Sequence, residues 1–285
     1  MMNNGEAIFF IRNNKGYSQR YVAADTMTQG AYSKFEKLNT EIRYSAIGNI
    51  LSKLEVTHDE FLYIKQGYEH DLRQQMLNRL FSLTYNDKDV LQKLLKDAEK
   101  YLKRNEDVLI ENLCLVCQSL IILSETKNIT LARVPINKVW QRISERNLLF
   151  INDIYFVNSI LYLFTIETAL EIKKFVFRSI EKYQNFRNIE RVKVNILINI
   201  TLLLVKEGRF KEAISEVEHA IVLCKKFSDY KRIAICYIRK GICLNNIEVT
   251  KGDEWISKGK YILIAIEEVT ILSALEDEIN RNKRI

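Results

Sequence analysis

Four residues in one short segment have the chemistry needed to read DNA base edges. They are Gln29, Gly30, Ser33 and Lys34, and helical spacing would place them on one side of a helix. Glutamine pairs with N6 and N7 of adenine and lysine donates to O6 or N7 of guanine, each contact being worth about 1 to 3 kcal/mol of discrimination. Glycine lets the backbone approach the groove. We therefore interpret the four residues as base-contacting positions of a helix that enters the major groove.

A second set of residues has donors suited to phosphate oxygens, which set register without reading sequence. Gln19 is expected to reach both a phosphate and the amide of Gln29, and so to hold that reader in position. The other backbone candidates are Ser18 and Thr28 at two helix starts, and Lys15, Lys37, Arg43 and Tyr44 in loops beside the helices.

The elements that must position these side chains are two short helices. Ser18 and Thr28 each provide a side-chain oxygen for the free amides of a first helical turn, so both helix starts are marked. Val22, Tyr32 and Phe35 supply apolar inward positions. This segment therefore predicts a helix-turn-helix motif.

Five helical segments follow one another near the N-terminus, and they predict one compact five-helix unit. Gly16 permits a turn after the first segment, and Thr57 with Glu60 forms a capping box before the last. The segments are 6–12, 19–24, 29–37, 44–54 and 59–64. Longer amphipathic helices follow Gly67, so we expect domains at 1–66 and 67–285.

Composition favours an all-α protein. Of 285 residues, 47% are hydrophobic and 28% charged, and the single proline and nine glycines leave few breaks for short strands and tight turns. The net charge of +7 is modest, and residues 1–54 carry seven Lys or Arg against four Asp or Glu. Such a balance neither establishes nor excludes DNA binding, but it predicts salt-sensitive nonspecific affinity.

The cysteines and histidines give no indication of a metal site or of catalysis. All five cysteines lie in apolar helical stretches, and Cys114 and Cys117 have zinc-like spacing without a second ligand pair. There are three histidines, and no phosphate loop, nucleophile elbow or supported carboxylate pair occurs. We expect no metal, no cofactor and no enzymatic activity.

The apolar runs predict no membrane span. The most apolar run after the N-terminus, 196–205, is about half of the roughly 20 residues that a span requires. The N-terminus has no extended apolar core. We therefore expect a cytoplasmic protein with no membrane partner.

The C-terminal part is predicted to form stacked helical hairpins. Its expected helices are 71–84, 88–104, 106–124, 136–147, 152–165, 168–186, 190–206, 210–226, 230–246, 252–268 and 270–282. The pair over 195–226 resembles a degenerate tetratricopeptide repeat, because Gly208 separates the helices and Ala213 and Ala220 allow close packing. Such stacks form a concave groove. An irregular helical bundle is the alternative architecture.

Residues 5–68 resemble the lambda-repressor-like domain of Rgg regulators, also called the MutR or GadR family. The likeness lies in Gly5-Glu6, Ile11-Arg12, Lys15-Gly16-Tyr17-Ser18-Gln19, Tyr32-Ser33-Lys34-Phe35-Glu36 and Asp59-Glu60-Phe61-Leu62, with a looser match over 152–164. The resemblance implies a transcription regulator whose helical repeats dimerise and, in several members, bind a short linear signalling peptide. It also implies an ion pair between Arg12 and Glu36. Leu38 departs from the pattern, where many relatives have glycine.

A peptide in the groove would need partners for its amides, and asparagine both donates and accepts. Residues four or seven apart share a helix face, which makes Asn158 with Tyr162, Asn195 with Asn199, and Arg232 with Arg239 the candidates for binding a short, apolar peptide. Asn199 has a structural role as its alternative, and either arginine could meet a peptide carboxylate.

These observations favour a homodimeric, peptide-controlled regulator that binds double-stranded promoter DNA. The alternatives are a protein-interaction scaffold built on the repeats, and a helix-turn-helix regulator that responds to no peptide. Dimerisation is expected because such domains read two half-sites about one helical turn apart. The last helices offer an apolar stripe for the contact, although packing within one chain explains it equally well: Ile262, Ile266, Val269 and Leu272.

Overall fold

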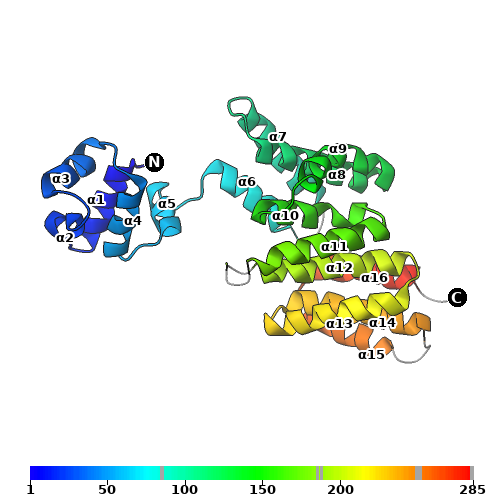
Figure 1. The fold of residues 1–285 in the computed structure, drawn as a ribbon. Coiled ribbons are helices and arrows are strands. Elements are labelled where there is room, and N and C mark those ends of the chain that lie inside the picture. Colours follow the sequence, from blue (N-terminus) through cyan, green and yellow to red (C-terminus); the bar gives the residue numbers. More distant parts are fainter. Residues whose placement is uncertain (84–86, 184–185, 187–188, 248–251, 283–285) are drawn as a thin grey trace. The chain divides into compact units, whose positions relative to one another are not determined.

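The computed structural model describes residues 1–83, 87–183, 186, 189–247 and 252–282, and these contain helices and no strand (Figure 1). The chain divides into two compact units, Met1–Met76 and Leu77–Ile285. The division falls within helix α6, Leu72–Phe81, rather than between residues 66 and 67. The predicted all-α class is confirmed.

The N-terminal unit contains the five predicted helices. They are α1 (Asn4–Asn14), α2 (Gln19–Ala23), α3 (Gln29–Leu38), α4 (Tyr44–Lys53) and α5 (His58–Lys65). Ser18, Thr28 and Thr57 each accept a hydrogen bond from a backbone amide three residues later, as a capping residue does. Local sequence therefore sets where α2, α3 and α5 begin.

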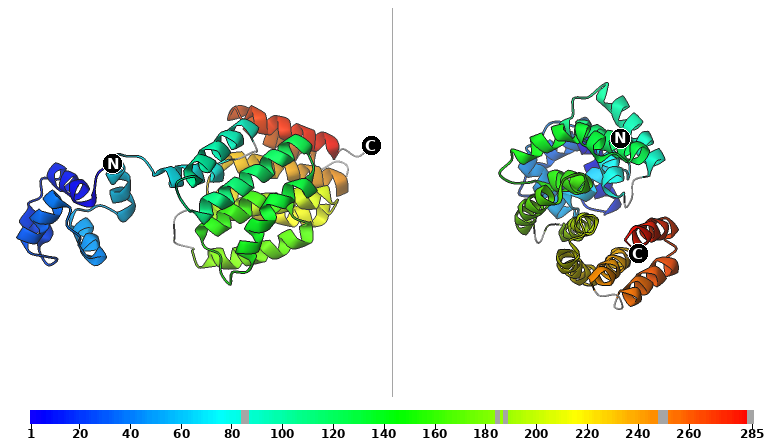
Figure 2. Two further views of the ribbon diagram at one scale, coloured as in Figure 1. Left: turned by 90° about the horizontal axis from the view of Figure 1, so that it is seen from above. Right: turned by 90° about the vertical axis from the view of Figure 1, so that its right-hand side faces the viewer.

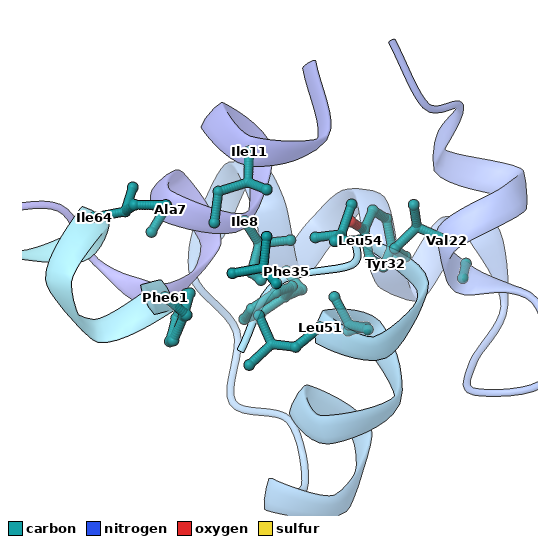
Figure 3. Packing of buried hydrophobic residues seen from close by; sticks show 13 residues of the cluster. Ala7, Ile8, Ile11, Val22, Tyr32, Phe35, Leu51, Leu54, Phe61 and Ile64 are labelled. Carbon is teal, nitrogen blue, oxygen red and sulfur yellow. The ribbon is translucent and has the colours of Figure 1, made fainter. Parts of the chain in front are cut away.

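One apolar core joins the helices of this unit. Figure 3 shows side chains from α1, α2, α3, α4 and α5 converging on Tyr32 and Phe35 of α3. Gly5 allows α1 and α3 to come close, because a Cβ there would lie 2.2 Å from the carbonyl oxygen of Phe35. The core and this close approach together fix the position of α3 in the unit.

The described residues of the C-terminal unit form a succession of helices of ten or more residues, with one 3₁₀ turn among them. They are α7 (Lys88–Leu102), α8 (Val108–Thr126), α9 (Ile129–Ser144), α10 (Ile151–Ile160), the 3₁₀ turn η1 (Leu161–Leu163), α11 (Ile166–Glu181), α12 (Glu190–Lys206), α13 (Phe210–Lys226), α14 (Tyr230–Ile247), α15 (Asp253–Ala265) and α16 (Val269–Arg281). Residues 84 and 184–185 of the predicted helices lie outside the described residues.

Consecutive helices of this unit pack as hairpins, and alternate helices also touch. The pairs α7–α8, α12–α13, α13–α14 and α14–α15 are in contact, and α8–α10, α10–α12, α12–α14 and α14–α16 form a second series of contacts. Figure 2 shows the stack from two further sides. Ala213 and Ala220 are fully buried. This is the arrangement expected of stacked helical repeats, in which alternate helices share one face.

Two sequence expectations about this unit were wrong. Helix α9 begins at Ile129 rather than at residue 136, with Pro135 inside it. An internal proline costs about 3 kcal/mol, but Asn128 caps the helix and Ala132 and Ile136 are completely buried, so packing outweighs the cost.

The second error concerns the most apolar long segment. Among the described residues, α8 rather than 196–205 has the length and apolar composition of a helix that could span a membrane. Half of the α8 segment is buried inside the unit, where it contacts α7 and α9. A helix buried in a protein core can have the same length and apolar composition as a helix that spans a membrane.

Candidate nucleic-acid interface and repeat groove

Helix α3 has well-defined ends. Its start is fixed by the Thr28 hydroxyl, which accepts a hydrogen bond from the amide of Ala31 at 3.2 Å. It ends at Asn39, whose φ of 49° is left-handed and is well tolerated by asparagine. The side chain of Asn39 also accepts a hydrogen bond from the amide of Gly5. Leu38 therefore stays helical, and the left-handed turn that ends α3 is made by Asn39.

The four predicted base readers lie on the outer part of α3. Gln29, Gly30 and Lys34 are exposed and Ser33 is half-buried, whereas Tyr32 and Phe35 are in the core. Nothing lies within 4 Å of the place where a Cβ at Gly30 would be. The unit therefore presents an open surface at the N-terminal end of α3, where a groove-binding helix makes its base contacts.

A buried ion pair fixes α3 to α1. Arg12 donates from Nε to Oε1 of Glu36 at 2.6 Å and from Nη2 to Oε2 at 3.0 Å, and its Nη1 donates to the carbonyl oxygen of Tyr17 at 2.7 Å. The hydrogen bond to Glu36 raises the pKa of Arg12. Burial, with the charge of Glu36 added, raises the pKa of Tyr32. The expected Arg12–Glu36 pair is thus present.

Gln19 completes this network and corrects one expectation. Its Nε2 donates to Oε2 of Glu36 at 2.7 Å, so the amide is directed to the ion pair rather than shared with Gln29. The reason is that Glu36 has two carboxylate oxygens and Arg12 leaves room on one of them for a further donor. Gln19 therefore joins α2 to α3 through Glu36.

The candidate phosphate-contacting residues are exposed, apart from Gln19, which is half-buried. Two of those expected in loops lie in helices. Lys37 is in the last turn of α3, and Tyr44 is the first residue of α4 and is 75% exposed. Arg43 precedes α4, and Lys15 follows α1, with its ammonium 3.6 Å from the carboxylate of Glu55. The hydroxyls of Ser18 and Thr28 serve as helix caps, as described above.

A cavity of about 140 Å³ lies in the C-terminal unit. It is lined by the end of α6 and by α8, α10, η1, α12 and α14, which include the alternate helices that share one face of the stack. Five of the six predicted peptide-binding residues line it: Asn158, Tyr162, Asn195, Asn199 and Arg232. The sequence pattern therefore selected residues from four separate elements, α10, η1, α12 and α14, that meet at one place.

Hydrogen bonds link the polar residues of this cavity. The side-chain amide of Asn199 donates to the carbonyl oxygen of Asn158 at 3.2 Å, which joins α12 to α10. Arg232 donates to Oδ1 of Asn195 and pairs with Asp229 at 2.7 Å. The side-chain oxygen of Asn158 is buried and accepts no hydrogen bond from the described residues.

Arg239 was wrongly predicted to face a peptide. It is only 7% exposed, and its Nε and Nη2 donate to the two carboxylate oxygens of Glu278 at 2.9 and 3.1 Å. Its Nη1 donates to the carbonyl oxygen of Ile198. Arg239 thus fastens α14 to α16 and α12, because α16 returns from a distant part of the chain and covers it.

Sequence reasoning missed the apolar part of the cavity. Its lining includes Leu80, Phe81, Leu120, Ile198 and Ile235. Phe81 stacks on Tyr155 with ring centroids 4.9 Å apart. Helical spacing could have placed Ile198 beside Asn195 and Ile235 beside Arg232. Only the fold brings α12, α14 and the end of α6 together.

The cysteines are buried as free thiols. Burial raises the pKa of Cys114 to about 11 and that of Cys117 to about 12. Among the described residues no group of three or more His, Cys, Asp or Glu side chains is arranged to hold a metal ion.

The apolar stripe at the C-terminal end is only partly packed. Ile262 is packed against the core of α12, α13 and α14, and Leu272 is half-buried. Ile266 and Val269 are 40% and 72% exposed. Ile262 and Leu272 therefore pack within the chain, whereas Ile266 and Val269 remain at the surface.

No family model and no curated protein sequence matches the chain. Several solved structures match over nearly its whole length. A proposed transcriptional regulator of Listeria monocytogenes EGD-e has a TM-score of 0.77 at 18% identity, with 99% of this chain and 97% of that chain covered.

Two further solved structures are similar to the chain. The pheromone receptor Rgg2 of Streptococcus dysgalactiae has a TM-score of 0.73 at 16% identity, covering 98% of each chain. PlcR of Bacillus thuringiensis, solved with the peptide PapR7 and DNA, has a TM-score of 0.71 at 15% identity, covering 96% of this chain and 99% of that chain. The chain therefore has the fold of these proteins, which is the fold that its resemblance to Rgg regulators implies.

Proposed function

We propose that the chain is a sequence-specific regulator of transcription that binds double-stranded promoter DNA through α3 and a short linear peptide in the repeat groove. One observation carries the proposal. A capped, rigidly anchored helix presents Gln29, Gly30 and Lys34 at an open surface, in a chain that also gathers asparagines around a cavity. The fold shared with PlcR, solved with a peptide and DNA, supports the same function.

The DNA-binding part has a direct test. A selection from random duplexes, using the full chain, should enrich one sequence motif. The double variant Gln29→Ala and Lys34→Ala should lose the preference for that motif over a scrambled duplex, because each base contact contributes about 1 to 3 kcal/mol. The matched control is the double variant Gln92→Ala and Lys96→Ala, which changes the same two residue types on α7. It should keep the preference for the motif. Enrichment of no motif, as a scaffold would give, contradicts the assignment.

The peptide-binding part is tested separately. The asparagines around the cavity would pair with the amides of an extended peptide, which must find partners when the peptide leaves water. Peptides encoded by small reading frames beside the gene should bind the full chain and lose affinity when Asn195 is replaced by alanine. A regulator that responds to no peptide would bind its operator equally with and without them.

We further propose that the protein acts as a cytoplasmic homodimer and has no catalytic role. The exposed Ile266 and Val269 offer apolar area for the dimer contact. Since Val269 is 72% exposed, Val269→Glu should leave the monomer folded. Sedimentation velocity should show the variant shifted toward monomer, and an unchanged dimer would remove this surface from the interface.

A further inference from the structure

The excess positive charge of the chain is concentrated in one part of the C-terminal unit. Residues 1–76 carry nine Lys or Arg and nine Asp or Glu, and residues 77–172 carry twelve of each kind. Residues 173–240 carry sixteen Lys or Arg against seven Asp or Glu, an excess larger than the net charge of +7 of the whole chain. The unit that contains α3 is therefore neutral, and the excess lies on the segment from α11 to α14.

The fold gathers part of this excess at one edge of the helical stack. Consecutive helices of the hairpins run in opposite directions, so α11 and α13 end at the edge where α12 and α14 begin. Two contacts mark this edge. Lys226 of α13 pairs with Glu190 of α12 at 2.8 Å, and the ammonium of Lys193 lies 5.6 Å from the ring centroid of Phe177 of α11.

Several cations at this edge have no carboxylate partner. Three cations of α13 and α14 are neutralised by ion pairs. Five others, which we call the basic edge, form no ion pair with a described residue: Arg178, Lys182, Arg191, Lys193 and Lys225. Lys193 is half-buried and the other four are exposed. Glu181 is the unpaired acid among the described residues of this edge, so an excess of positive charge remains there.

Helix stability explains only part of the basic edge. A cation near a helix C-terminus interacts favourably with the helix dipole, which accounts for Lys225 in the last turn of α13. Arg191 and Lys193 lie in the first turn of α12, where the dipole disfavours a cation. The rings of Phe227 and Phe177 hold these two side chains in place without neutralising them. Their charges therefore remain available to a partner.

The chemistry of this edge fits a polyanion, and the observations favour DNA. Double-stranded DNA carries one negative charge per about 1.7 Å of helix axis, whereas an extended acidic peptide carries at most one per about 3.3 Å. Under the proposed function α3 brings DNA to the chain, and its own unit has no net charge to attract phosphates. Because the two units are one chain, DNA held by α3 is at high effective concentration for the basic edge.

We propose that the basic edge binds phosphate groups of double-stranded DNA, as a second contact separate from α3. The inference rests on the proposed DNA-binding function and adds a sequence-independent part to it. Phosphate contacts carry no base information. The basic edge therefore contributes affinity and speed of association, and α3 contributes the choice of sequence.

Salt dependence tests the contact without a known operator. The full chain is titrated into a fluorescein-labelled duplex of mixed sequence, about 40 base pairs long, at about 50 to 200 mM KCl, and binding is followed by anisotropy. Each phosphate contact adds about 0.9 to the slope of log affinity against log salt. Replacing all five residues of the basic edge with glutamine should lower that slope by about 4.5. A fourfold rise in salt should then weaken the wild type about 500-fold more than the variant.

Helix α7 supplies the matched variant. Five exposed cations on it and directly after it are replaced with glutamine, which makes the same change in net charge: Lys93, Lys96, Lys100, Lys103 and Arg104. This variant should change the slope by less than about one. An unchanged slope in the basic-edge variant, or an equal reduction in both variants, refutes the contact. Since the duplex holds no selected motif, that failure removes the basic edge alone, and the random-duplex selection decides the role of α3.

Crosslinking locates the contact in a chain whose basic edge is intact. Val222 is 64% exposed and lies one turn before Lys225 on α13, and the native cysteines are buried. Val222→Cys carrying an azidophenacyl group should crosslink to the duplex. Val108→Cys, at a site that is 52% exposed at the start of α8, should not. Crosslinking no stronger at the first site than at the second overturns the proposal, even if the glutamine variant fails to fold.

An acidic polypeptide distinguishes DNA from a protein partner. Fluorescein-labelled poly-L-glutamate replaces the duplex in the same titration of the full chain. The duplex should bind at least about tenfold more tightly, because its charges are more closely spaced. If poly-L-glutamate binds more tightly and the basic-edge variant loses that binding, the edge belongs to an acidic protein and the proposed DNA contact is wrong.

Discussion

Replacing Glu36 with glutamine should loosen the N-terminal unit strongly. Glu36 is buried, with its side chain 1% exposed, and it accepts two hydrogen bonds from Arg12 and one from Gln19. Glutamine keeps the shape of the side chain but removes its charge. The guanidinium of Arg12, whose side chain is 11% exposed, then remains buried without a counterion.

The size of the effect follows from this burial. Removing one partner of a buried ion pair costs about 3 to 5 kcal/mol. We expect about 3 kcal/mol, because Arg12 keeps its bond to the carbonyl oxygen of Tyr17 and glutamine can still accept one hydrogen bond. This loss corresponds to a roughly 150-fold change in the opening equilibrium of the unit.

Hydrogen exchange measured by mass spectrometry resolves the change within the full chain. Slowly exchanging amides of α1 and α3 should exchange roughly 150-fold faster in Glu36→Gln, and those of α13 should not change. The control is Glu55→Gln, which removes the exposed pair with Lys15. That variant should change exchange by about twofold or less, because surface pairs contribute little.

A double variant separates charge from packing. Arg12→Met with Glu36→Met removes both charges and keeps apolar volume, and such replacements of a buried pair are often neutral or stabilising. Exchange of α1 and α3 should then return to within about tenfold of the wild type. Less than tenfold acceleration in Glu36→Gln, or equal acceleration in α13, would refute the view that this pair anchors α3 to α1.

Three further predictions follow from single positions. Gly30→Ala should stabilise α3 by up to about 1 kcal/mol, since a Cβ meets nothing there, yet weaken operator binding by about fivefold in a fluorescence anisotropy titration if the α3 backbone approaches the groove. Gly241→Ala should lower the thermal midpoint of the C-terminal unit, followed by tryptophan fluorescence, because its Cβ would lie 2.5 Å from the carbonyl oxygen of Gly252. The pKa of Cys117 and that of Cys243 are raised to about 12, so the thiolate forms only as pH approaches that value; native protein at pH 8 should react slowly with a disulfide reagent, and rapidly in urea.

The sequence predicted best those features that depend on near neighbours. The starts of α2 and α3 were found because the capping hydroxyls of Ser18 and Thr28 act three residues away. The same holds for the asparagines of the groove, since spacings of four along α12 follow from helix geometry. The Arg12–Glu36 pair, whose members are 24 residues apart, was expected from the residues themselves, and the resemblance to a family supported it.

Features set by distant parts of the chain were not predictable in this way. Arg239 has the spacing of a groove residue, and only the return of α16 shows that Glu278 covers it. Pro135 suggests a helix end, and only the burial of Ala132 and Ile136 explains why α9 continues through it. The cavity wall depends on Phe81 meeting Tyr155, which no local pattern indicates.

The N-terminal core has a consequence for how such a protein can be re-engineered and can evolve. All of its buried side chains come from residues 7–64, and the cluster of α12, α13 and α14 shares none of them. An exchange of α3 surface residues therefore requires no compensating change in the cavity, and the reverse also holds. Under the proposed function, operator preference and peptide preference can therefore change independently, and grafting a different α3 onto this chain should retarget DNA binding while the peptide that controls it stays the same.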